Sequence, residues 1–515
     1  MTGKAEEPAF EPVPAMVAAH AQRHPARLAL VDPRHRVSYG ELRQWMDAVA
    51  AGLQRDGVKP QQCIAICAAA SAEYAATFLG ALQAGMVVAP LSPSSTPQSL
   101  AAMLHDCEAT HLFLDEATEQ LLQGWSGLPT CKRVWLGRAP APAGMPAWRD
   151  WLGDPGRVQA VEIQPYWAFN IIYSSGTTGT PKGIMQPHSM RFMHVQRGVL
   201  NGYGTDARAL ISTPLYSNTM LVSFFPTLGL GGTAVIMPKF DATAFLELAQ
   251  REKITHAMLV PVQYQRLMAH PGFDDYDLSS FRMKFSTSAP FPAGVKADVL
   301  KRWPGGLIEY YGMTEGGGTC ILHAHETPHK LHTVGRPAPG HDIRLIDEEG
   351  REVAPGGTGE VVGHSPAMMT GYFKQPEKTA EAEWHAPDGK RFIRTGDLGR
   401  FDEDGFLILL DRKKDMIISG GFNVYPSDLE AVLRQHAQVA DAAVVGVPSE
   451  KWGETPVGFV VAREGVPLDA AALLDWANAQ LGKTQRLAAL RVLPGLPRSP
   501  IGKVLKRELR DGFSL

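Results

Sequence analysis

Hydrophobic residues follow two patterns that alternate along the first part of the chain. Residues 39–53 and 74–85 place apolar side chains three and four positions apart, which is typical of helices packed on a core. Residues 63–67 and 87–91 are short apolar runs of the kind that form buried strands. Because helix-like and strand-like segments follow one another, the pattern predicts α/β layers with parallel strand pairing.

Another apolar run, residues 167–173, leads directly into a polar loop whose composition suits a polyphosphate. Residues 173–183 read Tyr-Ser-Ser-Gly-Thr-Thr-Gly-Thr-Pro-Lys-Gly. Glycines let backbone amides approach a ligand, hydroxyls donate hydrogen bonds, and the lysine adds a cation. The spacing is not that of a P-loop, since Thr180 and Pro181 separate Gly179 from Lys182. A flexible linker is the alternative on composition, but linkers seldom follow directly on a buried strand.

Two later segments combine glycines with aromatic, hydroxyl and carboxylate side chains. Residues 308–318 read Ile-Glu-Tyr-Tyr-Gly-Met-Thr-Glu-Gly-Gly-Gly, and residues 394–397 read Arg-Thr-Gly-Asp. An aromatic ring can stack on a base, a hydroxyl can donate to a phosphate, and a carboxylate can bind a hard cation. Each segment taken alone is also compatible with a turn that carries a solvated carboxylate.

A change in residue composition near residue 410 predicts a domain boundary. A charged run, residues 411–415, precedes a short apolar run, a glycine pair and a helix-like segment that starts at Pro426. We therefore expect an N-terminal domain over residues 1–410 and a small C-terminal domain over 415–515, joined by residues 411–414. A solvated charge run is the alternative interpretation of residues 411–415.

Composition and charge narrow the class of protein. The 515 residues are 44% hydrophobic and 20% charged, as in globular proteins, and a net charge of −3 gives no reason to expect nucleic acid as a partner. The five cysteines show no paired metal-ligand spacing, and Cys63 and Cys67 would share one face of a core strand. No signal core and no apolar stretch of about 20 residues is present, so we expect a cytoplasmic protein without a transmembrane segment.

The phosphate-type loop identifies a resemblance to a known family. Residues 173–183 match, nearly letter for letter, the phosphate-binding loop of the adenylate-forming superfamily of acyl-CoA ligases, luciferases and peptide-synthetase adenylation domains. Segments at 284–291, 308–318, 394–407, 410–426 and 496–509 follow in the family's order. The resemblance implies an α/β fold, with a large N-terminal region of stacked α/β subdomains plus a small β unit, and a small mobile α+β C-terminal domain.

The resemblance also assigns roles to individual residues. It implies that Thr314, Glu315 and Lys503 are catalytic, that Glu315 holds Mg²⁺, that Lys414 is the hinge pivot, and that Ser288 stands where the family usually has glycine. Lys506, one turn beyond Lys503 if the segment is helical, is expected to face solvent. The implied ATP-binding residues are Ser174, Ser175, Gly176, Thr177, Thr178, Gly179, Thr180, Lys182, Ser288, Ala289, Pro290, Tyr310, Tyr311, Gly312, Met313, Asp397 and Arg412, and the implied coenzyme A path is Gly420, Gly421 and Phe422.

The acyl pocket is expected between a helix that starts near Pro187 and the turn Tyr216, Ser217, Asn218. His188, Arg191 and His194 are three apart and could form one polar edge of that helix, and His194 matches a family position that lines the pocket, although a packed or solvated histidine is the alternative. The turn has no aspartate to pair with a substrate ammonium, which disfavours amino acids. The glycines at 316–318 are expected to leave space for the acyl group.

The implied reaction is activation of a carboxylic acid by ATP and Mg²⁺ to an acyl-adenylate, followed by transfer to coenzyme A. Because the pocket candidates are mostly uncharged, we expect an apolar monocarboxylic acid, aryl or of medium to long chain. A stand-alone adenylation enzyme that loads a carrier protein is the main alternative, and a luciferase-like oxygenase would share the same motifs. The sequence leaves the oligomeric state open, a homo-oligomer included.

Overall fold

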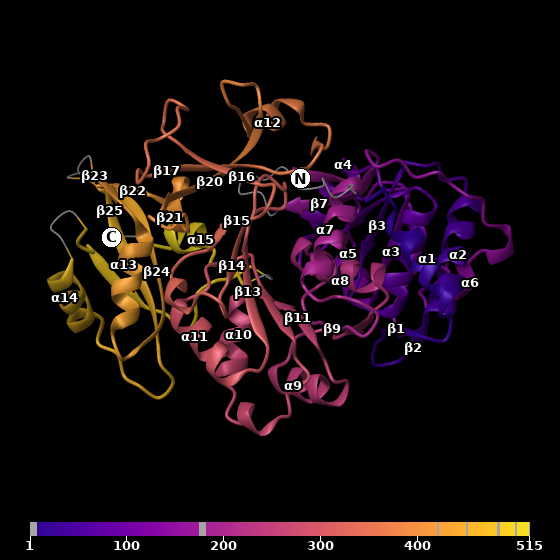
Figure 1. Ribbon diagram of the computed structural model, residues 1–515, viewed down its shortest axis with the longest axis horizontal. Coiled ribbons are helices and arrows are strands. Elements are labelled where there is room, and N and C mark those ends of the chain that lie inside the picture. The colour runs from indigo at the N-terminus through magenta and orange to yellow at the C-terminus, as the bar shows by residue number, and fades with distance from the viewer. Residues whose placement is uncertain are drawn as a thin grey trace, which may run out of the picture.

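Four β-sheets organise the part of the chain that the computed structural model describes, which is residues 8–174, 182–419, 422–449, 452–481, 485–499 and 502–513 (Figure 1). Two large sheets build most of the N-terminal region, a smaller antiparallel sheet follows them, and the fourth sheet belongs to the C-terminal domain at the left of Figure 1.

The first large sheet has seven strands in the order β18-β8-β7-β4-β3-β5-β6. Its central strands pair in parallel, and β8 runs antiparallel to β7. The strands are β3 (Cys63–Cys67), β4 (Val87–Pro90), β5 (His111–Leu114), β6 (Lys132–Trp135), β7 (Ala168–Ser174), β8 (Lys182–Pro187) and β18 (Gly371–Tyr372).

The second large sheet has nine strands in the order β15-β14-β13-β12-β11-β9-β10-β1-β2, and β1 and β9 to β13 run parallel. The strands are β1 (Leu28–Val31), β2 (Arg36–Ser38), β9 (Arg208–Ile211), β10 (Thr233–Ile236), β11 (His256–Leu259), β12 (Met283–Ser286), β13 (Gly306–Tyr311), β14 (Cys320–His323) and β15 (Arg336–Pro337).

Helices fill the space between these sheets and cover their outer faces. The main core joins inward residues of both sheets, such as Ile64 and Ala209, because successive strand residues face opposite sides. The central helices are α1 (Val13–Arg23), α2 (Tyr39–Arg55), α3 (Ala72–Gln83), α7 (His188–Leu200) and α8 (Asn218–Gly229). The outer helices are α4 (Pro97–Asp106) and α5 (Glu116–Leu122) on the first sheet, and α9 (Ala242–Arg251), α10 (Pro261–Met268) and α11 (Ala293–Arg302) on the second.

The two remaining sheets belong to the small β unit and the C-terminal domain. The β unit comprises β16 (Asp342–Ile346), β17 (Gly359–His364), β19 (Glu383–His385), β20 (Arg391–Phe401), β21 (Leu407–Arg412) and α12 (Pro376–Glu381). The last sheet comprises β22 (Ile417–Ser419), β23 (Phe422–Val424), β24 (Val439–Ser449), β25 (Gly453–Ala462) and β26 (Ala489–Val492), packed with α13 (Pro426–Gln435), α14 (Ala470–Gln480) and α15 (Lys506–Asp511).

The fold class predicted from the sequence is confirmed, and so are the patterns that led to it. The helical periods at 39–53 and 74–85 became α2 and α3, and Ser38 and Glu41 form a capping box at the start of α2. Cys63 and Cys67 lie together in an apolar core, as expected. No helix in the described ranges combines the length and the apolar character needed to cross a bilayer.

Two sequence expectations are wrong. Lys506 does not face solvent: its ammonium lies 2.9 Å from the Glu430 carboxylate on α13, and its side chain is 17% exposed. The glycines at 316–318 do not leave open space, because a Cβ on Gly316 or Gly318 would collide with Ala367 or Ile343. These glycines instead let the small β unit pack closely against the large sheets.

Candidate active site

Three segments with predicted site residues lie at the carboxyl ends of the parallel strands of the nine-stranded sheet. The turn with Tyr216 follows β9, Ser288–Pro290 follow β12, and Gly312–Glu315 follow β13. Loops at this edge of parallel α/β sheets are where ligands generally bind. The structure therefore gathers three segments that are far apart in the sequence at one edge.

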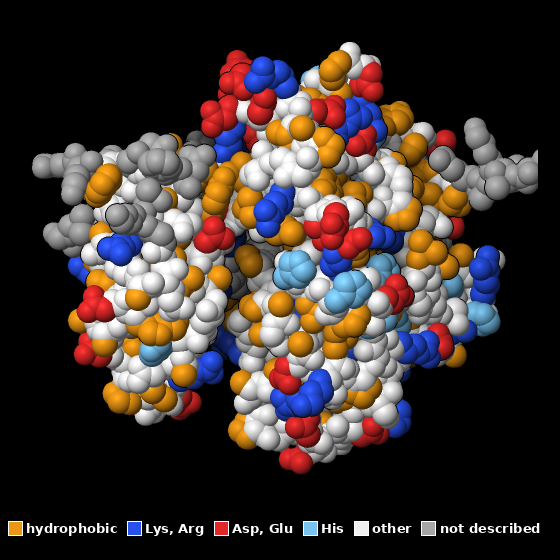
Figure 2. Space-filling view, turned by 60° about the vertical axis from the view of Figure 1, so that its left-hand side comes forward, with side chains coloured by type: hydrophobic (Ala, Val, Ile, Leu, Met, Phe, Trp, Pro, Cys, Tyr) orange, Lys and Arg blue, Asp and Glu red, His pale blue; other side chains and the backbone are white. Residues whose placement is uncertain are grey.

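The C-terminal domain contributes a loop to the same edge. Gly502 has a φ of +80°, and a Cβ there would lie 2.7 Å from the Val262 side chain, just after β11. The next residue is Lys503. The space-filling view shows a narrow groove between the C-terminal domain and the rest of the molecule (Figure 2).

Tyr311, Asp397 and Arg412 form a hydrogen-bonded group at the base of this loop. The Tyr311 hydroxyl donates to Asp397 Oδ2 at 2.8 Å, and Arg412 Nε lies 2.8 Å from Asp397 Oδ1 across the β20–β21 pair. Burial raises the pKa of Asp397, while the charge of Arg412, the Tyr311 hydrogen bond and the charge of Lys503 oppose that rise. Lys503 is therefore close enough for its charge to stabilise this carboxylate.

Glu315 lies on the other side of the site, held by a tyrosine that the sequence analysis missed. The Tyr372 hydroxyl donates to Glu315 Oε1 at 2.9 Å, and burial and this carboxylate raise the pKa of Tyr372. Lys182 Nζ, at the end of the predicted phosphate loop, lies 5.4 Å from the centre of the Tyr372 ring. Glu315 is a partly exposed carboxylate, and both it and Lys182 contact Tyr372, which suits a magnesium ion that is bound through one protein oxygen and through phosphates.

The predicted adenine residues are partly enclosed. Tyr310 stacks on Phe285 with 6.0 Å between the ring centres, accepts a hydrogen bond from Asn201 at 2.8 Å, and its ring centre lies 5.5 Å from the Arg197 guanidinium.

Ser288, in the next part of the predicted adenine site, has a φ of +82°, a conformation that favours glycine, and its hydroxyl forms a hydrogen bond with Thr219. Ala289 and Pro290 follow in the same loop, and Met313 packs against the apolar cluster around Tyr372.

Two of the predicted acyl-pocket residues, His194 and Asn218, meet at Arg191 on α7. Asn218 Oδ1 accepts a hydrogen bond from Arg191 at 2.8 Å, and His194 Nδ1 lies 3.4 Å from the same guanidinium. Ser217 is buried at the start of α8, and the Tyr216 hydroxyl interacts with Ser92 and Ser94. Arg191 is fully buried, and nothing in its sequence context distinguished it from a solvent-facing arginine.

Part of the prediction lies outside the described residues. These positions are Ser175, Gly176, Thr177, Thr178, Gly179 and Thr180 of the phosphate loop and Gly420 and Gly421 of the coenzyme A path. Ser174 ends β7, Lys414 lies in a short 3₁₀ turn and Phe422 begins β23, but their side chains are likewise outside the description.

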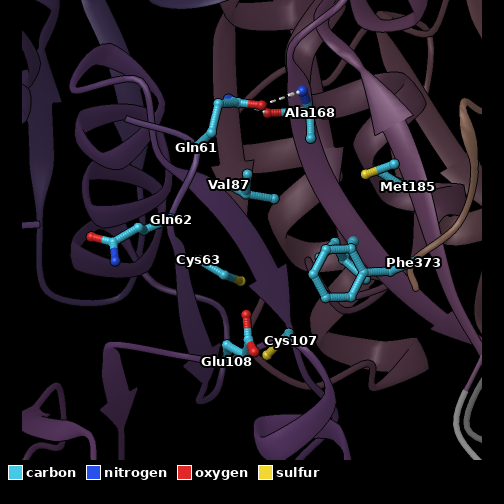
Figure 3. A pocket seen from close by; sticks show the side chains of 10 residues that line it. Gln61, Gln62, Cys63, Val87, Cys107, Glu108, Ala168, Met185 and Phe373 are labelled. Carbon is cyan, nitrogen blue, oxygen red and sulfur yellow. Dashed lines mark hydrogen bonds between the residues drawn. The ribbon is translucent and has the colours of Figure 1, made fainter. Parts of the chain in front are cut away.

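A separate cavity of about 250 Å³ lies in the seven-stranded sheet, at the amino ends of β3 and β4 (Figure 3). Its wall includes Gln61, which accepts a hydrogen bond from the Ala168 amide at 2.9 Å, together with Cys63 and Cys107. A hydrogen bond with the neighbouring Cys107 and burial raise the pKa of Cys63, so this thiol stays protonated. None of the predicted site residues lines the cavity.

Comparison with known proteins agrees with this arrangement. The family model of the AMP-binding enzyme matches residues 17–373, and that of the AMP-binding enzyme C-terminal domain matches residues 428–503. The chain therefore belongs to the AMP-binding enzyme family, within the adenylate-forming superfamily. It is an AMP-forming acid–thiol ligase of the acyl-CoA synthetase class.

Individual relatives cover almost the whole chain. An indoleacetate–CoA ligase of Aromatoleum aromaticum is 32% identical over 96% of both chains. A fatty acid–[acyl-carrier-protein] ligase, ScoC of Streptomyces coeruleorubidus, is 32% identical over 96% of this chain and 95% of its own. The structure of the amide bond synthetase McbA from Marinactinospora thermotolerans is 28% identical, covers 98% of this chain and 100% of its own, and has a TM-score of 0.84.

Proposed function

We propose that this protein activates an apolar monocarboxylic acid with ATP, forming an acyl-adenylate and pyrophosphate, and then transfers the acyl group to coenzyme A with release of AMP. The observation that carries the proposal is the meeting of Tyr311, Asp397 and Arg412 with the Lys503 loop at the strand ends where Glu315 also lies. This group combines an aromatic ring, a carboxylate and two cations, which are the side chains that suit the binding of a nucleotide.

The first step brings two anions together, since the substrate carboxylate attacks the α-phosphate of ATP and pyrophosphate leaves. Lys503 and Lys182 supply positive charge on the two sides of the site, and the Thr314 hydroxyl can donate to a phosphate oxygen. Glu315 would hold Mg²⁺, which when bound offsets phosphate charge. A general base is unnecessary because a carboxylic acid is already ionised at neutral pH.

Asp397 and Arg412 suit the ribose. A carboxylate accepts hydrogen bonds from both ribose hydroxyls, and the contacts of Asp397 with Tyr311 and Arg412 hold it in one orientation. The ring of Tyr311 is thereby fixed next to the sugar position, where it can stack on adenine.

The second step needs a different surface at the same strand ends. We therefore propose that the C-terminal domain rotates about Lys414, so that the Lys503 loop leaves and the segment with Gly420, Gly421 and Phe422 approaches the adenylate. The contact of Gly502 with Val262 is the arrangement expected for the first step.

A carrier protein is the alternative thiol donor. The relative named as a fatty acid–[acyl-carrier-protein] ligase and the relative named as an indoleacetate–CoA ligase are both 32% identical to this chain. Sequence identity alone therefore favours neither acceptor. The indoleacetate relative supports an aryl acid and the other a fatty acid, and both are apolar monocarboxylic acids.

The test is release of AMP and pyrophosphate by the purified protein with ATP, Mg²⁺ and a panel of aromatic and aliphatic acids, each with and without coenzyme A. Turnover that depends on coenzyme A supports the proposal and ranks the acids. Pyrophosphate release that coenzyme A does not change favours the carrier protein, and no release with any acid would refute acid activation.

A further inference from the structure

The face of α7 that meets the candidate acyl pocket carries a buried cation without a buried anion. His188, Arg191 and His194 are 1%, 0% and 8% exposed. Within the described ranges Arg191 has no carboxylate partner; its hydrogen-bond partners are neutral amides and a histidine, and its guanidinium lies near the rings of Phe169 and Phe225. Burying an unpaired guanidinium is costly unless its donors are satisfied.

Arg191 satisfies its donors with side-chain oxygens from three other elements. Asn170 Oδ1 on β7 accepts from Nε and Nη2, Gln186 Oε1 on β8 accepts from Nη2, and Asn218 Oδ1 on α8 accepts from Nη2 at 2.8 Å. A guanidinium has donors and no acceptor. Each partner must therefore turn an acceptor atom toward Arg191.

This requirement fixes the orientation of Asn218. Its Oδ1 accepts from Arg191 Nη2 and also from Gln186 Nε2 at 3.3 Å, so its NH₂ group points the other way. Gln186 Nε2 donates in addition to the Thr314 carbonyl at 2.7 Å, which ties the network to the predicted phosphate side of the site.

The same requirement fixes the tautomer of His194. Its Nδ1 lies 3.4 Å from Arg191 Nη1, and because Arg191 can only donate, Nδ1 accepts and the ring proton sits on Nε2. Burial and the charges of Arg197 and Arg191 lower the pKa of His194 well below its usual value, so the ring stays neutral. Neither His194 Nε2 nor Asn218 Nδ2 has a hydrogen-bond partner among the residues that the structure describes.

We propose that Arg191 is a positioning residue that presents two N–H donors, His194 Nε2 and Asn218 Nδ2, to the acid, so that the enzyme selects acids with an oxygen acceptor on an otherwise apolar body. A ketone, ether or ring carbonyl oxygen fits such donors, whereas a plain hydrocarbon chain leaves both unpaired. A site built to hydrogen-bond a polar group discriminates strongly against analogues that lack it. The inference rests on the proposed acid activation and narrows its substrate class.

The kinetic test compares matched acids that differ by one carbonyl: the 4-, 5- and 6-oxo derivatives of straight-chain acids and their parents. We expect kcat/KM for the best oxo acid to exceed that of its parent by about tenfold, the value of one well-placed hydrogen bond. In Arg191→Met this ratio should fall to about one. Equal rates for oxo and parent acids in the unaltered enzyme would overturn the inference while leaving acid activation intact.

A spectroscopic test does not depend on turnover. In ¹⁵N-histidine NMR spectra, His194, assigned by its loss in His194→Gln, should show an unprotonated Nδ1 and a protonated Nε2 from pH 6 to 8. Arg191→Met should shift it toward the other tautomer or allow it to protonate. Retention of the Nε2–H form in Arg191→Met would contradict the role of Arg191.

Controls separate this role from folding. Met193→Ala changes a 38% exposed side chain of α7 and should alter neither the oxo-to-parent ratio nor the His194 signal. If Arg191→Met does not fold, Asn218→Leu removes one donor and keeps the guanidinium, and it should reduce the ratio without changing the His194 tautomer. An unchanged ratio in Asn218→Leu would count against the proposal.

Discussion

At the scale of single residues, Ser288 occupies a backbone conformation that favours glycine. Its φ of +82° places it among five described non-glycine residues with positive φ, and it lies in the predicted adenine loop. We expect Ser288→Gly to stabilise the fold by about 1 kcal/mol, since the strain of such a conformation is of that order. Denaturant unfolding measures the change.

Lys253, with a φ of +48° outside the site, offers a matched control. Lys253→Gly should give a similar gain in the free energy of unfolding and leave the KM for ATP unchanged. A loss of stability in Ser288→Gly would mean that the hydrogen bond between Ser288 and Thr219 outweighs the backbone strain.

Tyr372 shows how a residue outside the recognised motifs can hold a predicted ligand in place. Its hydroxyl is bonded to Glu315, while its ring packs under Lys182. Tyr372→Phe keeps the ring and removes the bond, so we expect the Mg²⁺ concentration for half-maximal activity to rise roughly tenfold. Titration of activity with Mg²⁺ tests this, with Tyr276→Phe as a control outside the site. An unchanged Mg²⁺ requirement would separate Tyr372 from metal binding.

At the scale of elements, the sequence predicted those helices and strands whose apolar spacing is visible within the segment itself. Strand β7, helix α2 and helix α7 were expected because their apolar spacing or flanking residues are local features. The environment of α7 was not predictable in this way. His188, Arg191 and His194 lie on one face as their spacing implies, but Asn170, Gln186 and Asn218 from other elements make that face a buried one.

Lys506 was misjudged for the same reason. A basic residue near the end of the chain is usually solvated, but the fold brings Glu430 of α13 to its ammonium. The candidate site residues were predicted from their motifs, whereas Arg191, Gln186 and Tyr372 have partners far away in the sequence, which a single sequence does not reveal.

The buried face of α7 also predicts a pH dependence of stability. Burial lowers the pKa of His188 to about 3, and both of its ring nitrogens lack hydrogen-bond partners within the described residues. The unfolded chain would bind a proton at about pH 6.5 while the folded chain does not, so stability falls as the pH drops below about 6.5. This residue alone should account for about 2 kcal/mol between pH 8 and pH 5.

His188→Leu should therefore reduce the loss of stability on acidification. Burial also lowers the pKa of His256 and of His341, each to about 4, so part of the pH dependence should remain in the variant. Urea unfolding at pH 8 and pH 5 measures the difference. Identical pH dependence in the variant and the unaltered protein would show that His188 is protonated or paired in the folded state.

At the scale of the whole molecule, contacts at Gly502 and at Ser427 link the C-terminal domain to the rest of the chain. Gly502 packs on Val262, and Ser427 of α13 donates through its backbone amide to Asp411 at the end of β21, at 2.9 Å. Asp411 also interacts with Lys506, whose charge opposes the effect of burial in raising the pKa of this carboxyl. Contacts of this kind are consistent with a domain that changes position between the two proposed half-reactions.

The position of Lys503 in this arrangement gives the last prediction. Lys503→Ala should reduce adenylate formation from acid and ATP by about 100-fold or more, because it removes the cation that we propose offsets developing phosphate charge. It should leave thioester formation from pre-made acyl-adenylate unchanged, since that step is proposed to occur with the Lys503 loop withdrawn. Gly502→Ala, whose added methyl group would collide with Val262, should show the same selectivity with a smaller effect. Arg507→Ala, at an exposed position of α15, is the control for the C-terminal domain. Equal loss of both half-reactions in Lys503→Ala would refute the two-position mechanism, because a single arrangement would then serve both steps.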